Sequence, residues 1–357
     1  NITTGRSRFF TSVEERAVCL AGSVRLSVWL SVRLSVGCSV ADSYLTAERS
    51  AFARPSLPAC LLNFAGRRKC PCVKRILRMI LKYLGTAAAE GFPAAFCNCE
   101  NCKKARENAG KELRTRCQAM VDGKLLIDFP AETYLHAVRF GIDLSAIENL
   151  LVTHSHTDHF YAQELCNRGY RFALNMTAPA LDIYGNGEVR AVFEEGTRRE
   201  IRPAVAENLR FHTVRPFADF AAGDYRVLTL PAHHDEREEA LLHCVQRGGK
   251  TLFWLNDTGP MGEDVFSFLA EKGVEADLVS FDCTFADEEK PSSARHMNIF
   301  QNCEMREKMV KYRIVNANTK YYVTHFSHNG APFRDRMEQM AQKYGFIAAH
   351  DGAEVEV

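Results

Sequence analysis

The stretch Leu150-Leu151-Val152-Thr153-His154-Ser155-His156-Thr157-Asp158-His159 carries the most structural information in the chain. Its apolar first part is typical of a buried strand, and four side chains that can bind metals follow within six residues. Alternate side chains at a strand end point the same way, so His154 and His156 can reach one ion. The following turn can present Asp158 and His159 to a second ion. Imidazole and carboxylate ligands suit Zn²⁺, and also Mn²⁺ or iron, so the stretch predicts a two-ion centre rather than a solvated loop.

Three later apolar runs end in side chains that could complete such a centre. The first leads to His233 and His234, the second to Asp257 and the third to His325. A single residue of this kind is usually structural, but three in order behind the first stretch indicate a shared site at strand ends. The spacing by itself does not choose between His233 and His234.

From residue 79 onward, short apolar runs alternate with helical stretches. We expect strands at 80–84, 116–121, 124–128, 149–153, 208–213, 225–230, 240–246, 251–255, 277–281 and 320–323, and helices at 100–109, 131–139, 161–168, 262–272, 298–312 and 332–344. Paired strands mixed with strand–helix alternation favour a layered α/β fold over a pure Rossmann arrangement. No nucleotide-phosphate loop motif occurs, and Gly185-Asn186-Gly187 is interpreted as a turn.

The chain changes character near residue 78. Of its 45 Lys and Arg and 44 Asp and Glu, 13 and 4 lie in residues 1–78, which leaves a net charge of −8 for the rest. Residues 23–36 repeat Ser-Val-x-Leu with a period of four, which fits neither a strand nor a long helix. We therefore expect residues 1–78 to be a disordered or non-native extension and residues 79–357 to form one domain. A targeting or nucleic-acid-binding arm is the alternative for the basic segment.

Cysteine usage indicates metal binding rather than disulfides. Of 13 cysteines, five lie in residues 1–78, and Cys97, Cys99 and Cys102 form a C-x-C-x-x-C cluster. Three thiolates need a fourth ligand for a tetrahedral zinc, and His328 is the natural candidate; three free thiols in a turn are the alternative. The odd, clustered cysteines favour a reducing compartment, so we expect a cytoplasmic protein. No apolar run approaches the roughly 20 residues of a membrane helix, so we expect no membrane partner.

These motifs resemble the metallo-β-lactamase-fold hydrolases, which carry HxHxDH and then His, Asp and His on strand-end loops. The resemblance covers residues 79–357 and implies a four-layer αββα sandwich. It implies that one ion is held by His154, His156 and His234, that the other is held by Asp158, His159 and His325, and that Asp257 bridges them. Similar proteins place the ligand directly before Asp or Ser, which favours His234 as the ligand. His233 would then contact a ligand rather than the ion. The resemblance further implies that Asp128 orients a ligand histidine.

The cysteine cluster narrows the resemblance to the phosphoribosyl cyclic phosphodiesterases of phosphonate degradation. That family has C-x-C-x-x-C early and T-H-x-S-H late, as in Thr324–His328, and an opening similar to residues 85–93. The resemblance implies two Zn or Mn ions at the catalytic site and one structural Zn. It also implies hydrolysis of small cyclic phosphate esters by a metal-bound hydroxide that is available at neutral pH. The pyrroloquinoline-quinone biosynthesis protein B family has a similar opening, but its HxHxDH run is degenerate.

Asp257, Asp158 and His296 are the expected catalytic residues. Asp257 would bind both ions and orient the nucleophile beside the ligand Asp158, and His296 would contact phosphate or act as a general acid, unless it caps a helix or packs in the core. Asp282 follows a strand and could line the pocket, whereas residues 236–239 are interpreted as a solvated turn.

Two other functions stay open, an RNA- or DNA-processing nuclease of the same fold and a non-hydrolytic cofactor-biosynthesis protein. The net charge of −8 and the lack of a basic–aromatic stripe weigh against a nucleic-acid partner. We therefore expect a small-molecule phosphodiester substrate, with a homodimer left open. Assigning the substrate from the fold family is an analogy.

Overall fold

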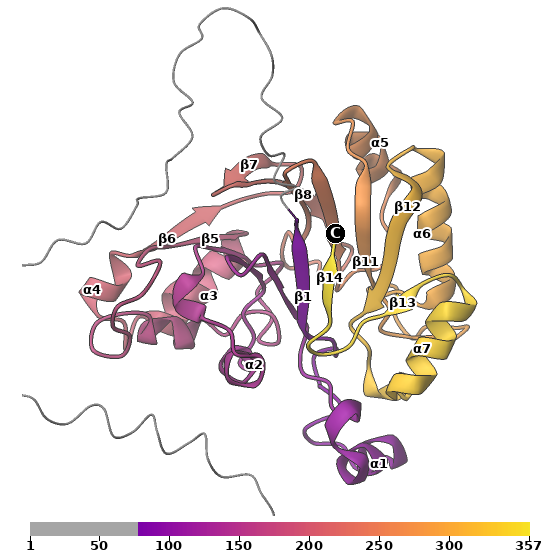
Figure 1. Cartoon of the computed structure of the whole chain (residues 1–357), viewed down its shortest axis with the longest axis horizontal. Coiled ribbons are helices and arrows are strands. Elements are labelled where there is room, and N and C mark those ends of the chain that lie inside the picture. Colours follow the sequence, from indigo (N-terminus) through magenta and orange to yellow (C-terminus); the bar gives the residue numbers. More distant parts are fainter. Residues whose placement is uncertain (1–77) are drawn as a thin grey trace, which may run out of the picture. The chain divides into compact units, whose positions relative to one another are not determined.

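The computed structural model describes residues 78–357. The interpretation of residues 1–78 as an extension falls almost wholly outside these residues. The described part contains two seven-stranded sheets with helices on their outer faces (Figure 1). This arrangement confirms the four-layer αββα sandwich.

The first sheet has the strand order β14-β1-β2-β3-β4-β5-β6. Strands β3, β4, β5 and β6 run parallel to one another, whereas β2 pairs antiparallel with β1 and β3, and β1 pairs antiparallel with β14. The strands of this sheet are β1 (Ile80–Gly85), β2 (Gln118–Val121), β3 (Leu125–Ile127), β4 (Asn149–Leu151), β5 (Leu181–Gly185), β6 (Leu209–Thr213) and β14 (Glu354–Glu356). Both β3 and β4 are apolar or buried along their whole length, as strands covered on both faces must be.

The second sheet has the strand order β13-β12-β11-β10-β9-β8-β7. Strands β10 to β13 are parallel to one another, whereas β7, β8 and β9 join as antiparallel neighbours. The strands are β7 (Asp219–Ala222), β8 (Tyr225–Pro231), β9 (Leu241–Arg247), β10 (Lys250–Leu255), β11 (Ala276–Asp282), β12 (Val315–Thr324) and β13 (Ile347–Ala348).

Three apolar cores hold the layers together. One core lies between the sheets and includes Tyr83 of the first sheet and Trp254 of the second. A second core packs the outer face of the second sheet against α5, α6 and α7, and a third packs the first sheet against α3, α4 and the segment around Leu165. The helices are α1 (Glu100–Asn108), α2 (Thr133–Phe140), α3 (Gly187–Thr197), α4 (Pro203–Ala206), α5 (Glu263–Glu271), α6 (Ile299–Lys311) and α7 (Arg334–Lys343).

The strand directions bring the polar strand ends to one edge of the sandwich. Parallel strands place their carboxyl ends at the same edge of a sheet, and β8 runs in the same direction as β10 because β9 is antiparallel to both. The carboxyl ends of β8, β10, β11 and β12 therefore lie at one edge of the second sheet, just before its predicted ligands. Strands β3 and β4 do the same for the first sheet.

The helix expected at 161–168 is present as a 3-10 helix at Ala162–Asn167, and its buried Ala162 and Leu165 are three residues apart, which suits three residues per turn. The interpretation of Gly185-Asn186-Gly187 as a turn was wrong, because Gly185 ends β5 and Asn186 caps α3. A Cβ at Gly185 would lie 2.6 Å from Val189 Cγ1, so a side chain does not fit there.

Several elements were not predicted from the sequence, namely β5, β7, β13, β14, α3 and α4. In the described part of the chain, no helix combines the length and the apolarity needed to cross a bilayer.

Candidate metal centre

Three histidines form the first donor group of the centre. The Nδ1 atom of His156 lies 3.0 Å from His154 Nε2 and 3.2 Å from His234 Nε2. Nitrogen ligands about 2.1 Å from a tetrahedral zinc would be roughly 3.4 Å apart, so the three atoms are close to the spacing that one ion requires. The neighbouring His233 is exposed, and its backbone N–H donates to Thr258 Oγ1 while its side chain lies outside this group.

Asp158, His159, Asp257 and His325 form a second, fully buried donor group. Within this group, His159 Nε2 lies 3.2 Å from Asp158 Oδ2 and 3.0 Å from Asp257 Oδ2. The Nε2 atom of His325 lies 3.6 Å from the same Asp257 oxygen. The two histidines and two carboxylates therefore converge as the ligands of a second ion would.

Asp257 joins the two groups. Its Oδ2 lies 3.3 Å from His154 Nε2 in the first group and 3.0 Å from His159 Nε2 in the second, and its Oδ1 lies 3.1 Å from His234 Nδ1. The residue follows β10 after Asn256 and has a φ of 61°, a left-handed backbone that Asp tolerates better than most residues. This turn aims the carboxylate back over the strand ends.

The donor atoms fit divalent ions. The Nε2 atoms of His159 and His325 are buried, and no hydrogen-bond partner for either exists among residues 78–357. Buried polar atoms are almost always bonded, so nitrogen atoms that point at carboxylates without bonding them indicate a missing ligand. Mixed imidazole and carboxylate donors are those that Zn²⁺ and Mn²⁺ accept.

The ionisation states at the centre also favour ligand binding. Burial and the neighbouring His159 hold the pKa of His154 well below its ordinary value, so the ring is neutral, as a ligand must be. Burial would raise the pKa of Asp257, but the neighbouring rings of His325, His159 and His296 outweigh it and hold that pKa well below its ordinary value. Asp257 is therefore a carboxylate.

Asp128 lies behind the first-sheet ligands. Its Oδ2 is 2.7 Å from His159 Nδ1, and its Oδ1 accepts hydrogen bonds from the backbone N–H and the hydroxyl of Thr153. The Thr153 hydroxyl in turn lies 3.0 Å from His154 Nδ1. Protons on the Nδ1 atoms leave Nε2 of both rings free for metal, which is the orienting task expected of Asp128.

Two further carboxylates contact candidate ligands in the same way, although Asp282 was expected only to line the pocket and no role was predicted for Asp235. Asp235 Oδ2 lies 3.0 Å from His156 Nε2, opposite the Nδ1 that faces the donor group. Asp282 Oδ2 lies 3.2 Å from His325 Nδ1, and Thr284 Oγ1 lies 2.8 Å from the same nitrogen. A usable signal existed, since Asp282 ends an apolar strand and Asp235 directly follows His234.

Replacing Asp282 with Asn should weaken the binding of the second ion. The amide cannot accept as strongly from His325 Nδ1–H, so the ring loses the partner that fixes its orientation, and losses of about 10- to 100-fold in metal affinity are typical. Chelator competition with Zn²⁺ would measure the change. Asp277→Asn, at the opposite end of β11, is the control, and equal affinities in the two variants would contradict the assignment.

Residues 236–239 were expected to form a solvated turn, but one of them, Glu238, contacts two distant segments. Glu238 accepts hydrogen bonds from the backbone N–H and the hydroxyl of Ser155, at 3.1 Å and 2.8 Å. Its other partner is the Asn186 side-chain amide, at 2.8 Å. Glu238 therefore ties the loop between His154 and His156 to the start of α3, a long-range contact that the local charge pattern could not reveal.

His296 lies against the centre. Its Nδ1 is 3.1 Å from Asp257 Oδ1 and 3.3 Å from Asp282 Oδ2, and its ring stacks on His325. Burial would lower the pKa of His296, but hydrogen bonds to the two carboxylates outweigh it and raise the pKa to about 10. The side chain keeps 21% of its surface exposed, and His156 keeps 34%, so solvent reaches the centre beside these two rings.

The three clustered cysteines meet His328 in space. The His328 Nδ1 atom lies 3.7 Å from Cys99 Sγ and 3.6 Å from Cys102 Sγ, and Cys97 completes the group. Bonds of about 2.3 Å to sulfur and 2.1 Å to nitrogen put these atoms roughly 3.6 Å apart around a tetrahedral zinc. The Cys102 backbone and the His328 ring lower the pKa of the Cys99 thiol to about 6, whereas burial raises that of Cys102 to about 11.

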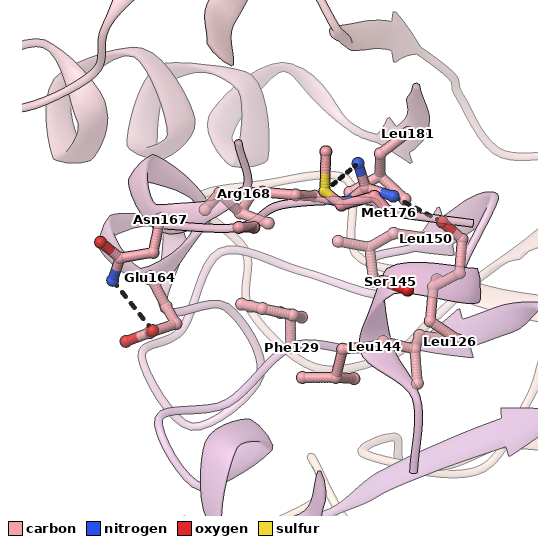
Figure 2. Close-up of a pocket in the computed structure, with 13 residues that line it drawn as sticks. Leu126, Phe129, Leu144, Ser145, Leu150, Glu164, Asn167, Arg168, Met176 and Leu181 are labelled. Carbon is pink, nitrogen blue, oxygen red and sulfur yellow. Dashed lines mark hydrogen bonds between the residues drawn. The ribbon is translucent and has the colours of Figure 1, made fainter. Parts of the chain in front are cut away.

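An apolar pocket of about 170 Å³ lies on the outer face of the first sheet, among residues of the third core (Figure 2). Leu126, Leu150 and Leu181 form part of its wall, and Arg168 lies at its edge. The Arg168 guanidinium donates to the carbonyls of residues 147, 178 and 179, so it fastens the covering segment. None of the lining residues belongs to a donor group.

The profile of the Beta-lactamase superfamily domain matches residues 126–326, which contain every predicted ligand of the centre. No curated protein matches the sequence. Among solved structures, a diphosphatase of the PhnP family is similar, with a TM-score of 0.61, 21% identity and coverage of 79% of this chain and 98% of the other.

Zinc-bound PqqB from Methylobacterium extorquens has a TM-score of 0.60 and 16% identity over 78% of this chain and 100% of the other. The short form of human tRNase Z has a TM-score of 0.53 and 18% identity over 77% and 98%. At these identities the structures show a common fold, and the profile match covers more than half of the chain. The chain therefore belongs to the β-lactamase superfamily and is a metallo-β-lactamase-fold hydrolase.

Proposed function

We propose that this protein is a phosphodiesterase that hydrolyses small, cyclic phosphate esters at a two-ion centre. The observation that carries the proposal is the meeting of two donor groups at one carboxylate, Asp257, with His296 beside it. An imidazole next to two metal ions suits a substrate with charged oxygens. The similarity to a solved diphosphatase of the PhnP family adds support, since 98% of that chain is covered.

The first donor group would hold one ion and the second group the other, with Asp257 shared. When bound, two divalent ions lower the pKa of water toward neutrality and stabilise charge that develops on phosphoryl oxygens. Asp128, Asp235 and Asp282 keep the histidine rings in the tautomers that face the ions. The chain itself thus supplies a preorganised ligand set that needs little rearrangement during the reaction.

His296 would bind and protonate the substrate. Its Nδ1 is engaged by Asp257 and Asp282, which leaves Nε2–H to donate to a phosphate oxygen or to the leaving alkoxide. An alkoxide is a poor leaving group unless it receives a proton as the P–O bond breaks. The raised pKa of His296 keeps the ring protonated near neutral pH, which suits a general acid.

We also propose that Cys97, Cys99, Cys102 and His328 hold a structural zinc. A site with four protein ligands is closed, so it stabilises the fold rather than activating water. His328 lies three residues after His325, and Glu90 accepts hydrogen bonds from the backbone N–H of His328 and the hydroxyl of Ser327. The zinc would anchor the loop that carries a ligand of the second ion.

Metal analysis with a substrate screen tests the proposed function. The purified protein should contain three metal ions per chain and turn over bis-p-nitrophenyl phosphate and cyclic phosphates. A lactone and a β-lactam serve as controls for other activities of the fold. Turnover of the lactone without the phosphodiesters would overturn the proposal, and cleavage of RNA in preference to small esters would favour the nuclease alternative.

Replacing His296 with Gln should have an effect that depends on the leaving group. With an alkyl phosphodiester we expect kcat to fall by about 10²- to 10⁴-fold, because the alkoxide loses its proton donor. With a p-nitrophenyl ester, whose leaving group needs no proton, the loss should be much smaller. Metal content is the control, and equal losses for both esters would show that His296 does not act as a general acid.

A further inference from the structure

A chain of buried hydrogen bonds reaches the metal centre from behind and uses residues that are not ligands. Gln118, in β2, and His136, in α2, are both fully buried. The Gln118 amide donates to the backbone carbonyl of Asp128 at 2.9 Å, and His136 Nδ1 lies 2.6 Å from Gln118 Oε1. Asp128 is the residue whose carboxylate meets His159.

The orientation of the Gln118 amide follows from its neighbours. The Thr133 hydroxyl donates to the Pro130 carbonyl at 2.7 Å, so its oxygen is an acceptor toward Gln118 Nε2, at 3.0 Å. The Asp128 carbonyl, which can only accept, takes the other Nε2 proton. Two acceptors thus fix Nε2, and Gln118 Oε1 must face His136.

This orientation fixes the tautomer of His136. Since Gln118 Oε1 can only accept, His136 Nδ1 must carry a proton. The ring's Nε2 lies 2.7 Å from Thr115 Oγ1, which also lies 2.7 Å from Asp351 Oδ2. One hydroxyl proton cannot serve both contacts, so a further proton resides on Asp351 or on His136.

The surroundings keep a second proton off the His136 ring. Burial lowers the pKa of His136 to about 4, with a smaller contribution from Arg139, and burial raises the pKa of Asp351. The charged groups that face the pair are Arg139, 3.5 Å from Asp351 Oδ2, and Arg114, which reaches Asp351 through the Thr86 hydroxyl. His136 is therefore a neutral ring with its proton on Nδ1.

The far end of the chain of bonds meets a strained backbone. Asp128 has a φ of 65°, a left-handed conformation that costs energy in a residue other than glycine. Its N–H donates to the Leu151 carbonyl and its C=O accepts from Gln118, so both polar groups of its backbone are engaged. Release of the carbonyl would free this residue to turn its carboxylate away from His159.

We propose that Gln118 and His136 are positioning residues of the metal centre, which hold the Asp128 carbonyl and thereby aim the Asp128 carboxylate at His159. The inference rests on the two-ion centre proposed above. It does not depend on the substrate. Its consequence is that a histidine on α2, which touches no ligand, sets the affinity for the second ion.

Two substitutions of the same histidine separate the two ends of its ring. The Asn amide in His136→Asn overlays Nδ1 and can still donate to Gln118, whereas the Gln amide in His136→Gln overlays Nε2 and reaches Thr115 instead. We expect His136→Gln to weaken Zn²⁺ binding at the second site by about 10- to 100-fold, and His136→Asn to stay within about threefold of the parent. Gln118→Met, which keeps the volume and removes the donor, should match His136→Gln.

Zinc affinity is measured by chelator competition on the full chain without substrate, and nitrogen-15 NMR reports the His136 tautomer. Zinc retained at the cysteine cluster, with unchanged unfolding midpoints, shows that each variant is folded. Equal affinities for the Gln and Asn variants, or an Nε2–H tautomer in the parent, would overturn the inference. If His136→Gln does not fold, the zinc affinity of Gln118→Met tests the inference by itself. A parent protein that binds no zinc outside the cysteine cluster would instead overturn the proposed function.

Discussion

Replacing Asp257 with asparagine is expected to lower phosphodiester hydrolysis by about 10³-fold or more, with a clear loss of bound metal. The two oxygens of Asp257 reach both donor groups, so its charge would hold two ions at once. Asparagine is the informative replacement because it tolerates the left-handed backbone at this position, where alanine would add strain. The loss then reports on charge and not on folding.

Kinetics at saturating Zn²⁺ and Mn²⁺, combined with metal analysis, check this result. Asp264→Asn is a suitable control, since it also removes a carboxylate close in sequence but lies on the exposed first turn of α5. The control should keep full activity. Turnover retained by Asp257→Asn with both catalytic ions still bound would refute the bridging role.

Replacing Cys102 with serine is expected to cost stability more than chemistry. Cys102 is fully buried, and its sulfur faces His328, so its loss removes one ligand of the proposed structural zinc. At free zinc 1,000 times above the dissociation constant, an intact site contributes about 4 kcal/mol to folding, and most of this would be lost. Metal content should fall from three ions to two, and kcat of the folded fraction should change much less than the free energy of unfolding.

Urea unfolding with and without a chelator measures this contribution. Cys303→Ser, on α6 and outside the cysteine cluster, is the matched control and should unfold like the parent. Chelator should destabilise the parent and the control but leave Cys102→Ser nearly unaffected. An unfolding curve for Cys102→Ser that still responds to zinc as the parent does would show that the cluster binds no structural ion.

The fold and the donor groups could be predicted because they depend on local order along the chain. Each ligand follows an apolar run that ends a strand, and parallel strand ends meet at one edge of a sheet. The prediction of an αββα sandwich is confirmed, and His154 and His156 meet His234, the choice that the family resemblance and not the spacing favoured. The roles of the ligands stay a prediction until ions are measured.

The carboxylates behind the ligands were not predictable in the same way. Asp282 and Asp235 act through partners that are 43 and 79 positions away in the sequence, and only the packing of two sheets brings each pair together. The Gln118–His136 contact is similar, since it depends on how α2 packs against β2. Spacing along the chain has no information about such pairs.

Helix α3 was also not predicted, although the local sequence indicates where it begins. Asn186 accepts a hydrogen bond from the Val189 N–H, which is the ordinary start of a helix, and Asn before a periodic segment predicts α3. The glycines on both sides directed the interpretation toward a turn instead. Gly185 is there because the strand and the following helix pack too closely for a side chain.

Each donor group takes ligands from both sheets, and this has a mechanical consequence. His154 and His156 follow β4 of the first sheet while His234 follows β8 of the second, and His159 faces His325 across the same gap. Bound ions would therefore cross-link the two sheets, which otherwise contact each other through apolar side chains. We then expect the chain to unfold more readily while its ions are absent. The lifetime of the folded state would therefore depend on how quickly lost ions are replaced.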